Sequence, residues 1–195
     1  MSKVIFYHGC MNSSKSAQLL MQNYNYKEQG LNTLLIKPTI DTRDGANAIS
    51  SRIGLKEESD WSITPDSSYN DIMDMFGNEW IDPDVILIDE AQFLSFDQIE
   101  SIIDYASDFE IEVHAFGLLK DFTNHLFEGS KALIELSDNM IEVKTTCSKC
   151  TRKATCNLRL SDGLPVYNGE IVQIGGNESY VSVCREHYYD YYAED

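Results

Sequence analysis

The sequence has few basic residues, and this shortage limits what the protein can bind. Lys and Arg number 15 against 32 Asp and Glu, so the formal net charge is −17. A protein that holds DNA or RNA by its phosphate backbone needs clustered Lys and Arg. We therefore expect no nucleic acid polymer as a partner. A small anionic ligand needs only a few local cations and backbone amides, so such a site is still compatible with the composition.

Long apolar runs are also missing. No stretch approaches the roughly 18 consecutive apolar residues needed to cross a bilayer. The amino terminus leads directly into Val4-Ile5-Phe6, without the basic region and small-residue cleavage site of a secretion signal. These two absences predict no membrane association and a cytoplasmic location.

Cysteine is scarce and unevenly placed. Five cysteines in 195 residues argue against a disulfide framework in a reducing compartment. The pairs Cys147-x-x-Cys150 and Cys184-x-x-His187 match the ligand spacing of a closed tetrahedral zinc site, whereas Cys156 is out of register with both. We predict one structural zinc ion on these four ligands. The alternative is a coincidental group of buried free thiols.

Short apolar runs alternate with amphipathic helical patterns through most of the chain. This alternation predicts an α/β fold with a mainly parallel sheet and helices on both faces. After Thr146 the pattern changes to short strands and metal-ligand residues. We expect one α/β domain over residues 1–145 and a small zinc-ribbon-like domain over residues 146–195. The expected strands are 3–7, 33–36, 84–88, 112–116 and 140–144, and the expected helices are 15–29, 95–108 and 127–136.

Two parts of this pattern carry more specific expectations. The first helix should turn Ala17, Leu20, Met21 and Tyr24 toward the core. From residue 38 to about residue 61 the chain loses its periodicity, and connections this long are usually functional lids or disordered segments.

A polar, glycine-led loop separates the first strand from the first helix. Its order suits a phosphate-binding loop, or P-loop, with backbone amides followed by Lys15 for the β- and γ-phosphates and the Ser16 hydroxyl for Mg²⁺. Ser14 stands where the motif prefers glycine, so it fits only if it avoids a strongly left-handed backbone. The alternative is that Ser13 or Ser14 merely caps the helix. The predicted nucleotide-binding run is Gly9, Cys10, Met11, Asn12, Ser13, Ser14, Lys15 and Ser16.

An acidic pair, Asp89-Glu90, follows an apolar strand. Ligands of open α/β sheets bind at the carboxyl ends of the strands. Asp89 is suited to holding Mg²⁺, and Glu90 to accepting a proton from an attacking hydroxyl. The alternative is a surface acid pair at the start of a helix, where the helix dipole favours it.

At these residues the chain resembles the type II thymidine kinases over essentially its whole length. The phosphate loop resembles theirs, and Asp89-Glu90-Ala91-Gln92-Phe93 resembles their catalytic segment. Residues 116–122 are similar to a further family stretch. Residues 174–180 and 184–188 look like the family's substrate loop and second zinc knuckle. Several motifs in the same order, from both predicted domains, carry the resemblance.

The resemblance implies ATP-dependent phosphorylation of the 5′-hydroxyl of thymidine, and of deoxyuridine, for nucleotide salvage. Glu90 would be the general base, and Ser16 and Asp89 would hold Mg²⁺. The ATP side would be completed by Asp41, Arg43, Asp89 and Gln92. The nucleoside would be bound by Met11, Phe127, Ile171, Val172, Gln173, Ile174, Gly175 and Tyr180. Because family members are commonly homotetramers, we expect a homo-oligomer.

The chain departs from the family at Ser14 and at Asn157, where several relatives have threonine beside the thymine methyl group. Two other activities are compatible with a P-loop and a zinc site. One is a nucleotide-dependent regulatory ATPase, although the net charge of −17 argues against a DNA-associated form. The other is a P-loop protein that binds nucleotide without catalysis.

Overall fold

A six-stranded parallel sheet forms the centre of the protein. The computed structural model describes residues 3–41, 45, 47–77, 82–169, 171 and 180–190. In this part of the chain the strand order is β5-β2-β6-β7-β1-β8, and each of the five neighbouring pairs is parallel. All five strands expected from the sequence are confirmed, and β5 is an addition. The bounds are β1 Val4–His8, β2 Thr33–Pro38, β5 Trp61–Ile63, β6 Val85–Ile88, β7 Glu112–Gly117 and β8 Asn139–Glu142.

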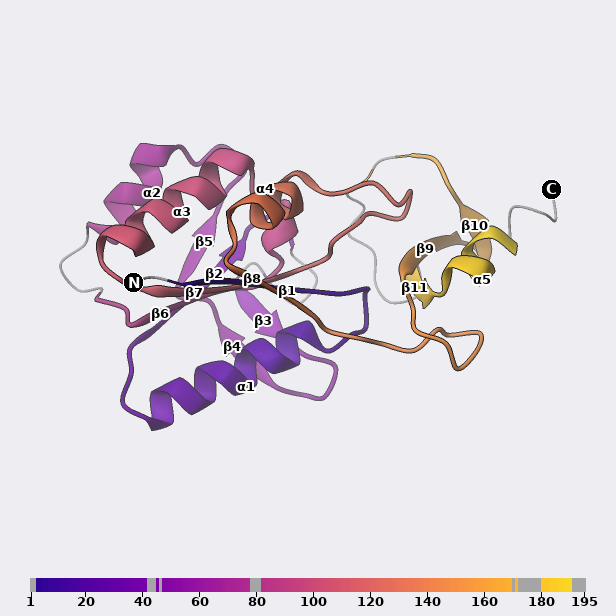
Figure 1. Cartoon of the computed structure of the whole chain (residues 1–195), viewed down its shortest axis with the longest axis horizontal. Helices are drawn as coiled ribbons and strands as arrows, with labels where there is room; N and C mark the ends of the chain where they lie inside the picture. The colour runs from indigo at the N-terminus through magenta and orange to yellow at the C-terminus, as the bar shows by residue number, and fades with distance from the viewer. Residues whose placement is uncertain are drawn as a thin grey trace.

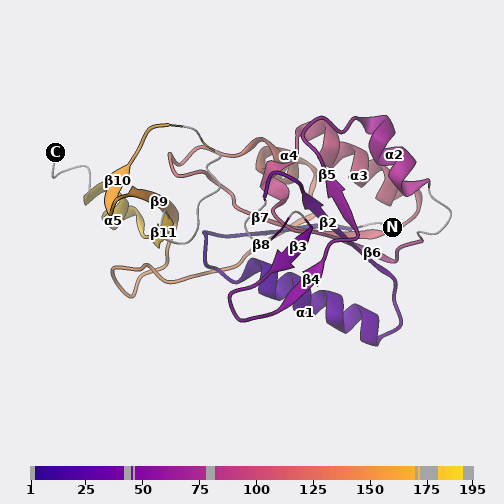
Figure 2. The ribbon, with the colours of Figure 1, turned by 180° about the vertical axis from the view of Figure 1, so that it is seen from behind.

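Helices cover both faces of this sheet, as expected (Figure 1). Helix α1 lies on one face and α2, α3 and α4 lie on the other, and the view from behind shows the same layers (Figure 2). Helix α2 was not among the helices expected from the sequence; it has 8 residues and begins at a capping box made by Ser68 and Asp71. No described helix is long and apolar enough to span a membrane. The bounds are α1 Lys15–Glu28, α2 Tyr69–Phe76, α3 Phe96–Asp108 and α4 Glu128–Leu136.

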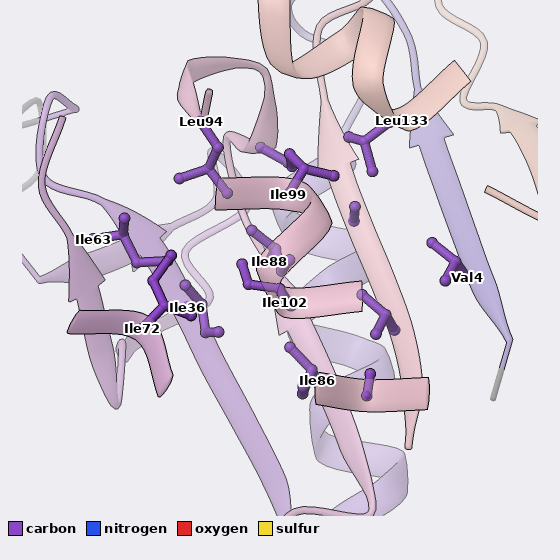
Figure 3. Packing of buried hydrophobic residues seen from close by; sticks show 14 of the residues in the cluster. Val4, Ile36, Ile63, Ile72, Ile86, Ile88, Leu94, Ile99, Ile102 and Leu133 are labelled. Carbon is purple, nitrogen blue, oxygen red and sulfur yellow. The ribbon is translucent and has the colours of Figure 1, made fainter. Parts of the chain in front are cut away.

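The strands separate two hydrophobic cores, because successive side chains of a strand point to opposite faces. Ile86 and Ile88 of β6 pack with Ile99 and Ile102 of α3 in one core (Figure 3). Leu87 of β6 belongs to the other core, on the α1 side. Burial of one such aliphatic side chain contributes about 1.5–3 kcal/mol. The loops at the ends of these strands therefore start from well-anchored positions.

Helix α1 is rotated relative to the expectation from the sequence. Ala17 and Leu20 are buried as predicted, but Met21 and Tyr24 are 47% and 63% exposed. The inward face instead includes Asn23, which is fully buried. Its side-chain Nδ2 donates to Glu57 Oε2 at 2.6 Å, so a polar residue takes an inward position that hydrophobic periodicity does not predict.

The aperiodic segment after β2 contains a hairpin. Strands β3 (Ala48–Ser50) and β4 (Lys56–Glu58) pair antiparallel, and the bond from Asn23 to Glu57 fastens the hairpin to α1. Strands of three residues with several charges give no period-two signal, which explains why the sequence indicated only a lid or a disordered segment.

The C-terminal part of the chain forms a separate small sheet, as expected for a zinc-ribbon-like unit. Its three strands are antiparallel in the order β10-β9-β11. A core of its own surrounds Leu158 and Val183. We refer to the described residues 146–169 and 180–190 as the C-terminal module. Its elements are β9 Cys156–Ser161, β10 Leu164–Val166, β11 Tyr180–Val183 and α5 Arg185–Asp190.

Candidate active site

The loop between β1 and α1 is strained. Asn12 and Ser14 both adopt the left-handed backbone conformation, with φ of 62° and 66°. Ser14 therefore has the left-handed backbone for which the phosphate-loop motif prefers glycine. The conformation costs a residue with a Cβ about 1–2 kcal/mol, and it persists only where the surrounding structure fixes the chain.

This loop is not a side-chain cap of the helix. Ser14 is the N-cap residue of α1, and its side chain makes no capping hydrogen bond. Of the two serines considered as caps, Ser14 therefore does not cap the helix through its side chain. The uncapped first turn of a helix presents backbone N–H groups and the positive end of the helix dipole, which together favour a bound anion.

Lys15 supplies a cation beside these amides. Its Nζ donates to the carbonyl oxygens of Gly9 at 3.4 Å and Cys10 at 3.0 Å. Gly9 has no room for a side chain, because a Cβ there would lie 2.3 Å from the carbonyl oxygen of Val143. The close approach of Gly9 to that segment brings the loop and its lysine against the end of the sheet.

Asp89, directly after β6, fits the role of a Mg²⁺ ligand. It is 4% exposed, and its Oδ1 accepts a hydrogen bond from Ser16 Oγ at 3.2 Å. Burial, followed by the charge of Glu90, raises the pKa of Asp89 to about 7. Hydroxyl and carboxylate oxygens are the hard ligands that Mg²⁺ prefers, and a cation at this point would offset the buried charge. The alternative of a surface acid pair is wrong, because Asp89 is buried.

Glu90 is held by a buried glutamine. Glu90 has a left-handed backbone (φ 51°), and its Oε2 accepts a hydrogen bond from Gln92 Nε2 at 2.5 Å. Gln92 Oε1 in turn accepts from the N–H of Leu118 at 2.9 Å. Gly117 makes room for this contact, because a Cβ there would lie 2.7 Å from Gln92 Oε1. Gln92 therefore fixes the carboxylate of Glu90 to the segment after β7.

These groups face a common cavity of about 380 Å³. Of the residues expected at the site, Gly9 and Cys10 belong to the phosphate loop but do not line the cavity. Arg43 and residues Val172, Gln173, Ile174 and Gly175 lie outside the described part of the chain. The expected residues that do line the cavity are Met11, Asn12, Ser13, Ser14, Lys15, Ser16, Asp41, Asp89, Glu90, Gln92, Phe127, Ile171 and Tyr180.

The cavity has further lining residues that the sequence did not indicate as site residues. Arg52, in the hairpin turn, and Lys120, after β7, add two cations to Lys15 in a chain with few of them. A basic residue in an aperiodic segment is a weak signal on its own. The position of Arg52 depends on the hairpin that Asn23 fastens to α1, and the sequence did not show that hairpin.

A second cluster lies in the C-terminal module. The ligand atoms of Cys147, Cys150, Cys184 and His187 all lie within 4.8 Å of one another. Cys150 Sγ is 3.9 Å from Cys184 Sγ, and His187 Nδ1 is 3.3 Å from Cys184 Sγ. A Zn–S bond of about 2.3 Å in a tetrahedron places neighbouring sulfurs about 3.8 Å apart. The four residues therefore fit one zinc ion.

Comparison with known proteins gives the family. A family model described as thymidine kinase matches residues 2–188. The chain is 44% identical over 189 residues to a thymidine kinase of Streptococcus gordonii, covering 97% of each protein. It is 46% identical over 190 residues to a thymidine kinase of Streptococcus thermophilus, covering 97% of this chain and 95% of the relative. The chain belongs to the thymidine kinase family.

A solved structure of the Pif1 helicase from Candida albicans aligns far less well with this member of the thymidine kinase family. The TM-score is 0.45 and the identity 15%, over 73% of this chain and 36% of the helicase. This likeness is too low to support any argument about function.

The left-handed backbone of Ser14 leads to a prediction about stability. Replacing Ser14 by glycine should raise the free energy of unfolding by about 1 kcal/mol, because glycine adopts this conformation without the Cβ clash. Urea unfolding measures the change. Ser13→Gly is the matched control: Ser13 has no positive φ, so glycine should destabilise the protein there. Equal losses in both variants would contradict the assignment of strain to Ser14.

The cysteine–histidine cluster leads to a second prediction. Purified, untagged protein should carry about one zinc ion per chain, and Cys147→Ser should lower both the zinc content and the melting temperature. Cys156→Ser is the matched control, because Cys156 lies in the same small core but outside the ligand cluster. Metal analysis checks both variants. The zinc site is refuted if the wild type contains no zinc or if Cys156→Ser loses as much zinc as Cys147→Ser.

Proposed function

We propose that the protein transfers the γ-phosphoryl group of ATP to the 5′-hydroxyl of thymidine, with deoxyuridine as a second acceptor. Membership of the thymidine kinase family makes it a kinase. The observation that carries the finer proposal is the meeting of the phosphate loop, the Ser16–Asp89 pair and Glu90 at one cavity of about 380 Å³. This arrangement brings phosphate ligands and a base together at the end of β6.

The phosphate side of the reaction is assigned to the loop. The amides of the loop and the Lys15 ammonium would bind the β- and γ-phosphates. Ser16 and Asp89 would hold Mg²⁺, which neutralises the charge of the phosphates when it is bound. Lys37 holds Asp41, a residue expected on the ATP side. Its buried Nζ lies 3.4 Å from Asp41 Oδ2 and donates to the Ala48 carbonyl at 2.6 Å. It thus ties Asp41 to the base of the hairpin.

Glu90 is assigned as the general base that accepts the proton of the 5′-hydroxyl. A base contributes to the rate only when it is held within hydrogen-bond reach of that proton. The bond from Gln92 limits the carboxylate of Glu90 to one position, which supports this role. The sequence predicted that Gln92 binds ATP. We assign it instead the role of orienting the carboxylate of Glu90.

The nucleoside is assigned to the part of the cavity near the C-terminal module. Phe127, Ile171 and Tyr180 line this part, and the ring of Phe127 packs edge-on against Phe93 at 5.8 Å. Aromatic side chains of this kind offer faces on which a pyrimidine can stack. Residues 172–175, which are also expected to bind the nucleoside, lie outside the described residues.

Two further proposals concern the organisation of the protein. We place a domain boundary between residues 145 and 146, supported by the change from a parallel to an antiparallel sheet and by the separate cores. We also propose a homo-oligomer, a tetramer by resemblance to the family. Edge strand β8 supports association, because Met140 and Ile141 are 40% and 37% exposed there.

The proposal is tested by Glu90→Gln. The variant should bind ATP and thymidine normally but lose at least about 10²-fold in kcat, because the amide keeps the shape of the side chain and cannot accept the proton. Glu100→Gln, an exposed change on α3, is the control. Steady-state kinetics of both variants give the answer. A near-normal kcat in folded Glu90→Gln would remove Glu90 from the reaction.

A further inference from the structure

Met11 of the phosphate loop is held at both of its main-chain groups by side chains of the C-terminal module. Its N–H donates to Asn157 Oδ1 at 2.9 Å. Its carbonyl oxygen accepts a hydrogen bond from Ser182 Oγ. The next carbonyl along, that of Asn12, accepts from Thr145 Oγ1 at 3.2 Å. The phosphate loop is therefore attached to residues that lie more than a hundred positions later in the sequence.

Asn157 and Ser182 are a directly opposed pair on neighbouring strands. Asn157 of β9 is in register with Ser182 of β11, so the two side chains leave the same face of the small sheet. Both are buried, at 5% and 4% exposure. Asn157 Nδ2 also donates to the carbonyl of Lys120 at 3.1 Å, so one amide group bonds both the phosphate loop and the segment after β7.

The hydrogen bonds to Met11 stabilise a strained part of the loop. Asn12, the residue after Met11, has the left-handed φ of 62°, and Ser14 follows with 66°. Strained residues relax unless neighbouring contacts over-determine their conformation. Bonds to both the N–H and the carbonyl of Met11 fix the chain immediately before the first strained residue.

The expected zinc ligands lie next to Ser182 in the fold. Ser182 lies two residues before the ligand Cys184, and its carbonyl accepts the N–H of Ser148, which lies between the ligands Cys147 and Cys150, at 2.9 Å. The position of the Ser182 hydroxyl is thus set by the strand that the metal cluster holds at its end.

We infer that Asn157 and Ser182 are positioning residues that hold the phosphate loop in its nucleotide-binding shape. The inference rests on the proposed function, because it takes a nucleoside triphosphate as the ligand of this loop. It also gives the C-terminal module a role in nucleotide binding, in addition to lining the nucleoside part of the cavity.

The test compares Ser182→Thr with Ser182→Val, two variants of nearly the same shape of which only the first keeps a hydroxyl. Each is prepared as the full, zinc-loaded chain. Calorimetric titration with Mg²⁺ and a non-hydrolysable β,γ-imido analogue of ATP measures the affinity. We expect Ser182→Val to bind the analogue about ten-fold more weakly than Ser182→Thr, the usual effect of losing one buried hydrogen bond. Zinc content and melting temperature show that both variants are folded.

Further variants keep the test decisive. If the valine variant does not fold, Ser182→Ala is compared with Ser161→Ala, an exposed serine at the end of β9 that serves as the control. Asn157→Leu should weaken binding to a similar degree. Combined with Ser182→Val, its effect should be less than multiplicative, because both changes act through Met11.

Two outcomes distinguish a failure of the positioning role from a failure of the proposed kinase function. Equal affinities of Ser182→Thr and Ser182→Val would overturn the positioning role while leaving nucleotide binding intact. A wild-type protein that binds none of the analogue would overturn the proposed function, and the positioning role with it.

Discussion

The hydrogen bonds to the main chain of Met11 are the constraint on which the active site depends. They join the phosphate loop, which belongs to the parallel sheet, to the C-terminal module. Asn157 and Tyr180 of this module line the cavity together with the loop. The bonds also fix the chain just before Asn12 and Ser14, whose left-handed conformation costs about 1–2 kcal/mol for each residue. One cavity is therefore lined both by the phosphate loop and by the C-terminal module.

The second requirement is the common edge of the sheet. The carboxyl ends of parallel strands meet at one edge, where ligands of open α/β sheets bind. β1 leads there into the phosphate loop and β6 into Asp89 and Glu90, while β7 leads into Leu118. Gln92 connects the last two, because its amide bonds both the Glu90 carboxylate and the Leu118 N–H. The Glu90 carboxylate is thus fixed by a neighbouring strand as well as by its own.

The sequence predicted those features that a local pattern determines. Buried parallel strands such as β6 form continuous apolar runs, and the order of residues in the phosphate loop and in the two zinc knuckles follows from the chemistry of their ligands. The hairpin was missed because it is held by a polar bond between Asn23 and Glu57 rather than by apolar periodicity. The same bond explains why the buried face of α1 includes Asn23 and not the predicted Met21 and Tyr24.

Features that depend on distant contacts could not be predicted. The backbone of Ser14 is set by how the loop is held, and serine itself does not favour a left-handed conformation. The bond between Met11 and Asn157 spans 146 positions. In the sequence, Asn157 differs only in standing where several relatives have threonine beside the thymine methyl group. In the structure its amide bonds the main chain of two segments.

The most direct test of the account is to identify the product. Zinc-loaded protein is incubated with Mg²⁺ and ATP labelled at the γ-phosphate, with and without thymidine, and the nucleotides are separated by chromatography. The account predicts that the label appears in thymidine 5′-monophosphate in amounts equal to the ADP released, with little ADP formed when thymidine is absent. ADP release that does not depend on thymidine, with the label in free phosphate, would contradict it.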